Sequence, residues 1–100
     1  MKTVEVSVVR IYTLERADNV PQILNYLQNE AKILGISVYR GLSGFGETGV
    51  QTDDFLDISF SLPLIIEFFD EPEKVKAILD YLGGLLENER FISFNAQMGL

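Results

Sequence analysis

The sequence predicts an α+β fold, a ferredoxin-like βαββαβ sandwich with a long loop between its second and third strands. Four segments are rich in β-branched and aromatic residues, and two segments with apolar residues at helical spacing separate the first from the second and the third from the fourth. At 100 residues and 47% hydrophobic composition, the chain can bury one core. We therefore expect residues 1–100 to form a single domain.

The first half of the chain is predicted to form a strand, a helix and a second strand. Residues 4–12 have the composition of a buried or half-buried strand. Asn19 then offers a helix N-cap, Pro21 suits the first turn, and Gly35 supplies a stop. The apolar stripe of this helix contains Ile23, Leu24, Leu27, Ala31 and Leu34. Residues 37–42 are expected to form the second strand.

The second half repeats this order with a strand, a helix and a strand. Residues 62–69, LPLIIEFF, are the most strand-like octet in the sequence. Asp70 and Glu73 have the spacing of a capping box, with Pro72 in the first turn of the second helix. The apolar stripe of that helix contains Val75, Ile78, Leu79 and Leu82. Residues 91–98, FISFNAQM, alternate apolar and polar, which predicts a last strand that is polar on one side.

This order of elements leaves one face of the sheet without helices. In the βαββαβ arrangement both helices cover the same face of an antiparallel sheet. The first and third strands are apolar at nearly every position, so a lone domain would expose a large apolar patch. We therefore expect the chain to associate with copies of itself.

Charge and composition exclude several kinds of partner and compartment. The formal net charge of -7, with eight Lys and Arg residues in all, argues against nucleic acid as a partner. A chain without cysteine has neither disulfides nor a thiolate site, which fits a reducing cytosol. No apolar run approaches the roughly 20 residues of a membrane span, and the first residues alternate polar and apolar. We expect an uncleaved, cytoplasmic protein that does not insert into a membrane.

The inventory of side chains argues against an enzyme and against a metal site. With no His and no Cys, the common general base, thiol nucleophile and imidazole ligand are absent, so we expect no catalytic residues. Acidic residues of the long loop have oxygen ligands for a hard cation, but their spacing does not match a calcium loop. A solvated acidic loop is therefore favoured over a cation site. These residues are Glu47, Asp53, Asp54 and Asp57.

Glycines gather at the base of the long loop. The connection from Leu42 to Leu62 is far longer than the roughly two to five residues that a hairpin needs. Gly41, Gly44 and Gly46 lie beside the second strand, where positive φ angles would let backbone N–H groups approach a bound anion. The alternative is a tolerated insertion without a ligand. The glycines match neither the dinucleotide fingerprint nor the P-loop pattern.

Residues 31–82 carry a set of motifs that covers about half the chain. These motifs are RGxxGFG at residues 40–46, Ser61-Leu62-Pro63 leading into Ile66-Glu67, and Asp70 followed by Glu73-Lys74-Val75, with RIY at residues 10–12 in addition. With them the chain resembles the small PII-like proteins of domain of unknown function 190. The loop departs from that family at Val50, Gln51 and Thr52, where relatives commonly carry a His-Thr pair.

The resemblance implies a function as well as a fold. It implies a PII-like homotrimer in which residues 43–60 correspond to the effector loop of PII signalling proteins, with ligand sites in the clefts between subunits. Relatives are often encoded near membrane ion-transport genes, which implies a membrane transport protein or another regulated partner. We expect a signal-transduction protein that senses an adenine nucleotide or another small anion. The alternative is a structural or partner-binding module without a small-molecule ligand.

Two charged residues in apolar strands are candidates for the ligand site. Arg40 and Glu67 each need a partner, which can be the other residue across the two strands or across a subunit interface. In the functional alternative, Arg40 contacts a phosphate and Glu67 orients a ligand or the loop base, while Arg90 of a neighbouring subunit adds a second cation. The expected ligand-binding residues are Arg40, Gly41, Gly44, Phe45, Gly46, Glu67 and Arg90.

Overall fold

The structure is a computed structural model that describes residues 1–46, 49–52, 62–86 and 89–100. Its elements are β1 (Thr3–Leu14), α1 (Val20–Asn25), η1 (Tyr26–Glu30), β2 (Gly35–Arg40), β3 (Ser43–Gly46), β4 (Gly49–Thr52), β5 (Pro63–Asp70), α2 (Pro72–Leu82) and β6 (Arg90–Gly99). The segment η1 is a π-helix that continues α1. Within the described ranges, no helix is long and apolar enough to cross a membrane.

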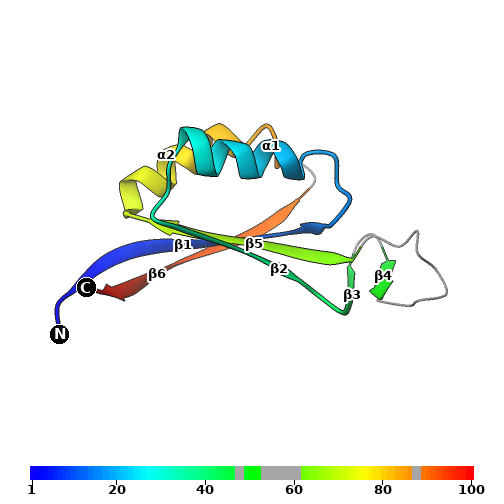
Figure 1. Ribbon diagram of the computed structural model, residues 1–100, viewed down its shortest axis with the longest axis horizontal. Coiled ribbons are helices and arrows are strands. Elements are labelled where there is room, and N and C mark those ends of the chain that lie inside the picture. Colours follow the sequence, from blue (N-terminus) through cyan, green and yellow to red (C-terminus); the bar gives the residue numbers. More distant parts are fainter. Residues whose placement is uncertain (47–48, 53–61, 87–88) are drawn as a thin grey trace.

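The strands β1, β2, β5 and β6 form one antiparallel sheet in the order β2-β5-β1-β6. Figure 1 shows α1 and α2 side by side over the same face of this sheet. The predicted ferredoxin-like fold is therefore confirmed, and each of the four predicted strands lies within a residue or two of its expected bounds.

The hydrophobic core lies between this sheet and the helices. Residues of β5 alternate between buried and half-buried, as expected for a strand with one face against helices. The predicted helical stripes supply the other side of the core. The core residues are Val9, Ile11, Val20, Ile23, Leu27, Leu64, Ile66, Phe68, Val75, Ile78, Leu82 and Leu86.

The first helix ends earlier than the sequence predicts. The N–H of Ala31 donates to the carbonyl of Tyr26 at 2.8 Å and closes the π turn, and Lys32 follows with a φ of 51°. A left-handed residue at this position terminates a helix. Gly35 is therefore not the stop and instead begins β2. It must be small because a Cβ there would overlap the ring of Phe69.

Asn19 precedes α1 as predicted but does not cap it with its side chain. Its backbone carbonyl accepts the N–H of Ile23 at 3.0 Å, and no side-chain cap bond forms. The side-chain Nδ2 instead donates to the carbonyl of Leu85 at 2.6 Å. Asn19 thus ties the start of α1 to the segment that follows α2. Pro21 occupies the first helical turn, as predicted.

Asp70 links α2 to β2 and does not form the predicted capping box with Glu73. Its side chain is buried at 4% exposure. Oδ1 accepts the N–H of Glu71 at 2.7 Å, and Oδ2 accepts the N–H of Leu34 at 3.0 Å. The Lys74 ammonium also lies 3.0 Å from Oδ2. A buried carboxylate with this many donors fixes the start of the helix against Leu34, the residue before β2.

The long connection between β2 and β5 contains a two-stranded sheet that the sequence does not predict. β3 pairs antiparallel with β4, from Ser43 opposite Thr52 to Gly46 opposite Gly49. This small sheet lies at the end of the molecule away from both termini (Figure 1). The acidic residues expected in the loop, Glu47, Asp53, Asp54 and Asp57, lie outside the described residues.

The positive φ of Lys32 predicts a stabilising substitution. Glycine adopts the left-handed region without the strain of a side chain, so Lys32→Gly should raise the free energy of unfolding by about 0.5–1 kcal/mol. Urea denaturation measures the change. Lys32→Ala is the matched control, because alanine removes the charge and keeps the strain. An equal gain in both variants would show that the side chain, and not the backbone angle, is the cause.

Candidate functional site

The sheet face without helices, which we call the open face, carries many apolar side chains. Residues directly opposite each other on antiparallel strands share a face, so the register of the sheet identifies them. Several are well exposed, including Tyr39 at 51% and Ile92 at 46%. The apolar residues of the open face include Val4, Val6, Val8 and Tyr12 of β1, Tyr39 of β2, Ile65 and Phe69 of β5, and Ile92, Phe94, Ala96 and Met98 of β6.

An ion pair lies in the middle of these apolar residues. Arg10 of β1 is directly opposite Glu67 of β5, and its Nε donates to Glu67 Oε1 at 2.7 Å. The guanidinium carbon also lies 5.1 Å from the ring centroid of Phe94. The hydrogen bond to Glu67 raises the pKa of Arg10 above its ordinary value, so the guanidinium stays charged. The pair therefore neutralises the only charges that these two strands place at the centre of the face.

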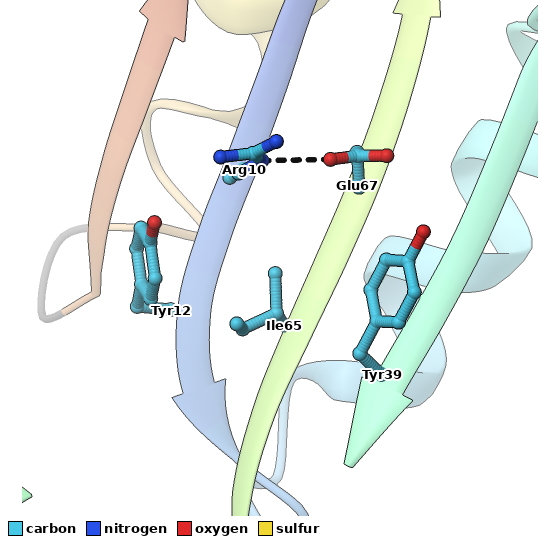
Figure 2. Close-up of a pocket in the computed structure, with 5 residues that line it drawn as sticks. All are labelled: Arg10, Tyr12, Tyr39, Ile65 and Glu67. Carbon is cyan, nitrogen blue, oxygen red and sulfur yellow. Dashed lines mark hydrogen bonds and ion pairs between the residues drawn. The ribbon is translucent and has the colours of Figure 1, made fainter. Parts of the chain in front are cut away.

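A depression of about 260 Å³ adjoins this ion pair. It is lined by Arg10, Tyr12, Tyr39, Ile65 and Glu67. Figure 2 shows all five side chains on the same side of β1, β5 and β2, with Tyr12 and Tyr39 on either side of Ile65. The depression thus combines two aromatic rings, an aliphatic floor and a charged rim. Aromatic residues and arginine around an apolar centre are typical of protein interfaces.

The loop base is held by a separate set of contacts. Arg40, the last residue of β2, places Nη2 3.0 Å from Glu15 Oε1. The backbone N–H of Glu15 donates to the carbonyl of Leu62 at 2.8 Å, and that of Gly41 donates to the carbonyl of Pro63 at 2.8 Å. Together these bonds join the ends of β1, β2 and β5 where the long connection leaves and returns.

Arg40 and Glu67 do not pair with each other across strands of the same chain, so that one of the alternatives drawn from the sequence is wrong. Arg40 is opposite Leu64, which is buried against the helices, whereas Glu67 is opposite Ser37. Side chains alternate between the two faces of a strand, so Arg40 lies on the helix side and Glu67 on the open face. Each has its own partner, Glu15 and Arg10 respectively.

Gly41 is required for a close approach and not for a positive φ. Its backbone is outside the left-handed region, and a Cβ at this position would lie 3.2 Å from the Cβ of Pro63. Its N–H is already bonded to the Pro63 carbonyl. The amide of Gly41 is therefore not a ready donor for an anion, in contrast to the expectation from the sequence.

The other glycines of the motif lie in β3, together with Phe45. Gly44 is opposite Gln51 and Gly46 is opposite Gly49. Hydrogen-bonded and non-hydrogen-bonded pairs alternate along an antiparallel ladder, so the N–H groups of Gly44 and Gly46 point the same way. Within the described part of the chain, no group of His, Cys, Asp or Glu residues is placed to hold a metal ion.

Arg90 begins β6 and lies opposite Tyr12, on the open face. β6 and β2 are the two edges of the sheet, so Arg90 and Arg40 occupy opposite edges as well as opposite faces. Within one chain these two cations do not converge. A shared ligand would need Arg40 from one subunit and Arg90 from another.

Sequence reasoning missed Arg10, Tyr12 and Glu15 as site residues. Arg10 and Tyr12 were visible as polar and aromatic interruptions of an apolar strand, two positions apart and therefore on one face. Glu15 gave no signal, because its role depends on the chain returning to it at Leu62.

The hydrogen bond between Arg10 and Glu67 predicts that the Nε proton of Arg10 is protected from exchange with water. The Nε–H of Arg10 should exchange slowly with water because it donates to a carboxylate, and Glu67→Gln should speed that exchange. Arginine side-chain NMR measures it. Glu15→Gln is the matched control, since Glu15 binds the Nη2 of Arg40. Fast Arg10 exchange in the native protein, or the same change in the control, would contradict the pairing.

Solved structures of CPII from Thiomonas intermedia K12, described as a nitrogen regulatory PII-like protein, match nearly the whole chain. The structure of CPII bound to ADP and bicarbonate superposes with a TM-score of 0.76 at 21% identity, covering 99% of this chain and 93% of CPII. The structure bound to ADP, AMP and bicarbonate gives 0.78 at 17% identity, covering 99% and 92%. The apo form gives 0.70 at 20% identity, covering 99% and 97%. The fold is therefore PII-like.

Two relatives and a family model match the sequence itself. A UPF0166 protein of Methanocaldococcus jannaschii is 36% identical over 70 residues, which are 70% of this chain and 64% of that relative, less than two thirds of its length. A UPF0166 protein of Aquifex aeolicus is 30% identical over 89 residues, 84% of this chain and 85% of the relative. The family model DUF190, described as "Uncharacterized ACR", matches residues 6–98. The chain belongs to the family of domain of unknown function 190.

Proposed function

We propose that this chain is a non-enzymatic, PII-like regulatory protein of the cytoplasm. It works as a homotrimer, binds an adenine nucleotide or another small anion in a cleft between subunits, and regulates a partner such as a membrane transport protein through residues 43–60. The observation that carries this proposal is the open face, an apolar surface centred on an ion pair and joined to the loop base by β1, β2 and β5.

The chemistry of the open face supports assembly. Side chains such as Tyr39 and Ile92 remain about half exposed, although they belong to a continuous apolar surface. Arg10 and Glu67 satisfy each other, so covering the face would bury a neutral pair instead of an isolated charge. A second and a third copy of the same chain offer apolar surfaces of the same chemistry. In a closed, symmetric assembly every copy buries its open face.

The cations at the sheet edges support an anionic ligand. Arg40 at the β2 edge and Arg90 at the β6 edge can converge only between subunits. The solved CPII structures contain ADP, AMP and bicarbonate, which makes adenine nucleotides the first candidates for this chain. Glu15 competes with an anion for the charge of Arg40, so the proposed affinity is modest.

A second candidate function is partner binding without a small ligand. Two observations favour it, since Arg40 is already paired with Glu15 and the amide of Gly41 is already bonded to Pro63. In this alternative the contacts at the loop base are purely structural. The open face and the loop then act only by binding other proteins.

The proposed assembly predicts a stability that depends on protein concentration. For a protein that folds and associates together, the urea midpoint rises with concentration, here between about 1 and about 100 μM. Ile65→Asp places an unpaired charge on the open face and should lower the midpoint and remove this dependence. Val38→Asp is the control, because Val38 is 46% exposed and lies on the other face, opposite Ile66. A native midpoint that does not change with concentration would contradict the assembly.

The proposed ligand site predicts how affinity for nucleotides responds to the charges at the loop base. In calorimetry with ATP, ADP and AMP, Arg40→Ala should weaken binding about tenfold, the usual effect of losing a charged hydrogen bond. Glu15→Gln should tighten binding, because it frees Arg40 from its carboxylate partner.

Lys76→Ala, which removes one exposed positive charge from α2, is the control for the net charge. No heat with any of the three nucleotides would favour partner binding without a ligand. Equal affinity in Arg40→Ala and the native protein would remove Arg40 from the site.

A further inference from the structure

A second depression, of about 360 Å³, lies on the helical side of the molecule, away from the open face. The residues around it come from α1, η1 and the C-terminal end of α2, so the proposed assembly through the open face would leave it uncovered. We call it the helix depression. It is lined by Gln22, Asn25, Tyr26, Glu30, Tyr81, Gly84 and Leu85.

The π-helix shapes this depression. The i to i+5 bond from the N–H of Ala31 to the carbonyl of Tyr26 widens the last turn of the first helix. Tyr26 and Glu30, the first and last residues of η1, both line the depression. Such turns are rare and concentrate at functional sites, because they place side chains where a regular helix would not.

Two tyrosine rings form one wall of the helix depression. The rings of Tyr26 and Tyr81 are stacked, with centroids 4.1 Å apart and an angle of 15° between their planes. Tyr26 is half-buried, whereas Tyr81 is 56% exposed although its ring is large and apolar. One face of Tyr81 covers Tyr26, and more than half of the surface of Tyr81 remains exposed.

The polar groups of the helix depression favour positive charge. Among the residues that the structure describes, those lining the depression include no cation, and Glu30 supplies a carboxylate beside the amides of Gln22 and Asn25. Desolvation by burial raises the pKa of the Tyr26 hydroxyl, and electrostatic repulsion from Tyr81 and Glu30 raises it further. At neutral pH the Glu30 carboxylate is the charged group among these three, and it is the group that attracts a cation.

We propose that the helix depression binds a guanidinium group, which stacks on the exposed face of Tyr81 and pairs with the Glu30 carboxylate. A guanidinium is planar and weakly hydrated, so it extends a stack of aromatic rings and donates to a carboxylate at the same time. An ammonium has no plane to match the ring. The source of the group is either an arginine side chain of a partner protein or a small guanidinium compound.

NMR titration of the 100-residue chain tests this site with defined probes. The peptide acetyl-Gly-Arg-Gly-amide and the small molecule agmatine represent the two sources. A peptide with citrulline in place of arginine is the control, because citrulline has nearly the same shape without the charge. Saturable shifts of the amides of residues 22–31 and 81–85 are expected with the arginine peptide and absent with the citrulline peptide. Saturation by agmatine at equal affinity would show that the guanidinium alone is recognised.

Three variants and one control separate the contribution of the Tyr81 ring to binding from that of the Glu30 charge. Glu30→Gln and Tyr81→Ala should each weaken binding of the arginine peptide about two- to fivefold, the usual range for exposed ion pairs and cation–π contacts. Tyr81→Phe keeps the ring and should bind like the native protein. Glu73→Gln, at the other end of α2, removes the same charge and should have no effect.

Thermal unfolding of each variant shows that it is folded before it is titrated. Equal shifts with the citrulline and arginine peptides, no saturable shift with either guanidinium probe, or unchanged affinity in Glu30→Gln would each overturn the proposal. None of these outcomes depends on the nucleotide site or on the assembly through the open face.

Discussion

Both helices of this chain pack on one face of its sheet, and this constraint determines which surfaces remain for function. Right-handed crossovers in a βαββαβ chain place the helices together, so the second face has no cover from its own chain. Here that face carries Tyr39, Ile65, Ile92 and Phe94 around the pair of Arg10 and Glu67. Our proposed trimer follows from this asymmetry, because the apolar area is large and its central charges are already neutral.

The same strands connect the open face to the loop base. β1 carries Arg10 in its middle and ends one residue before Glu15, which holds Arg40 and the carbonyl of Leu62. In the proposed regulation, a change in the contacts between neighbouring copies at the open face would be transmitted along β1, β2 and β5 to the loop base. An anion that binds Arg40 would also change the loop base, because it competes with Glu15 for the guanidinium. Both signals would therefore reach the β3–β4 sheet through the same contact between Arg40 and Glu15.

The local features of the fold were predictable from the sequence, and the long-range ones were not. The composition of residues 62–69 and the spacing of Val75, Ile78 and Leu82 predicted a strand and a helix, because each pattern depends only on neighbours in the chain. The partners of Arg40 and Glu67 depend on the register of β2 and β5, which sequence patterns do not give. No residue type in the sequence indicates the π turn of η1 or the left-handed φ of Lys32. The stacking of Tyr26 on Tyr81 is likewise a contact between distant parts of the chain, which sequence patterns do not give.

If copies of the same chain cover the open face, the mass of the native protein in solution is a multiple of the mass of one chain. Sedimentation equilibrium at micromolar concentration gives that mass without reference to shape. We expect a single species of three chains, about 34 kDa for a chain of 11.3 kDa. A stable monomer of 11.3 kDa across the same concentrations would contradict it and would leave the apolar open face without an explanation.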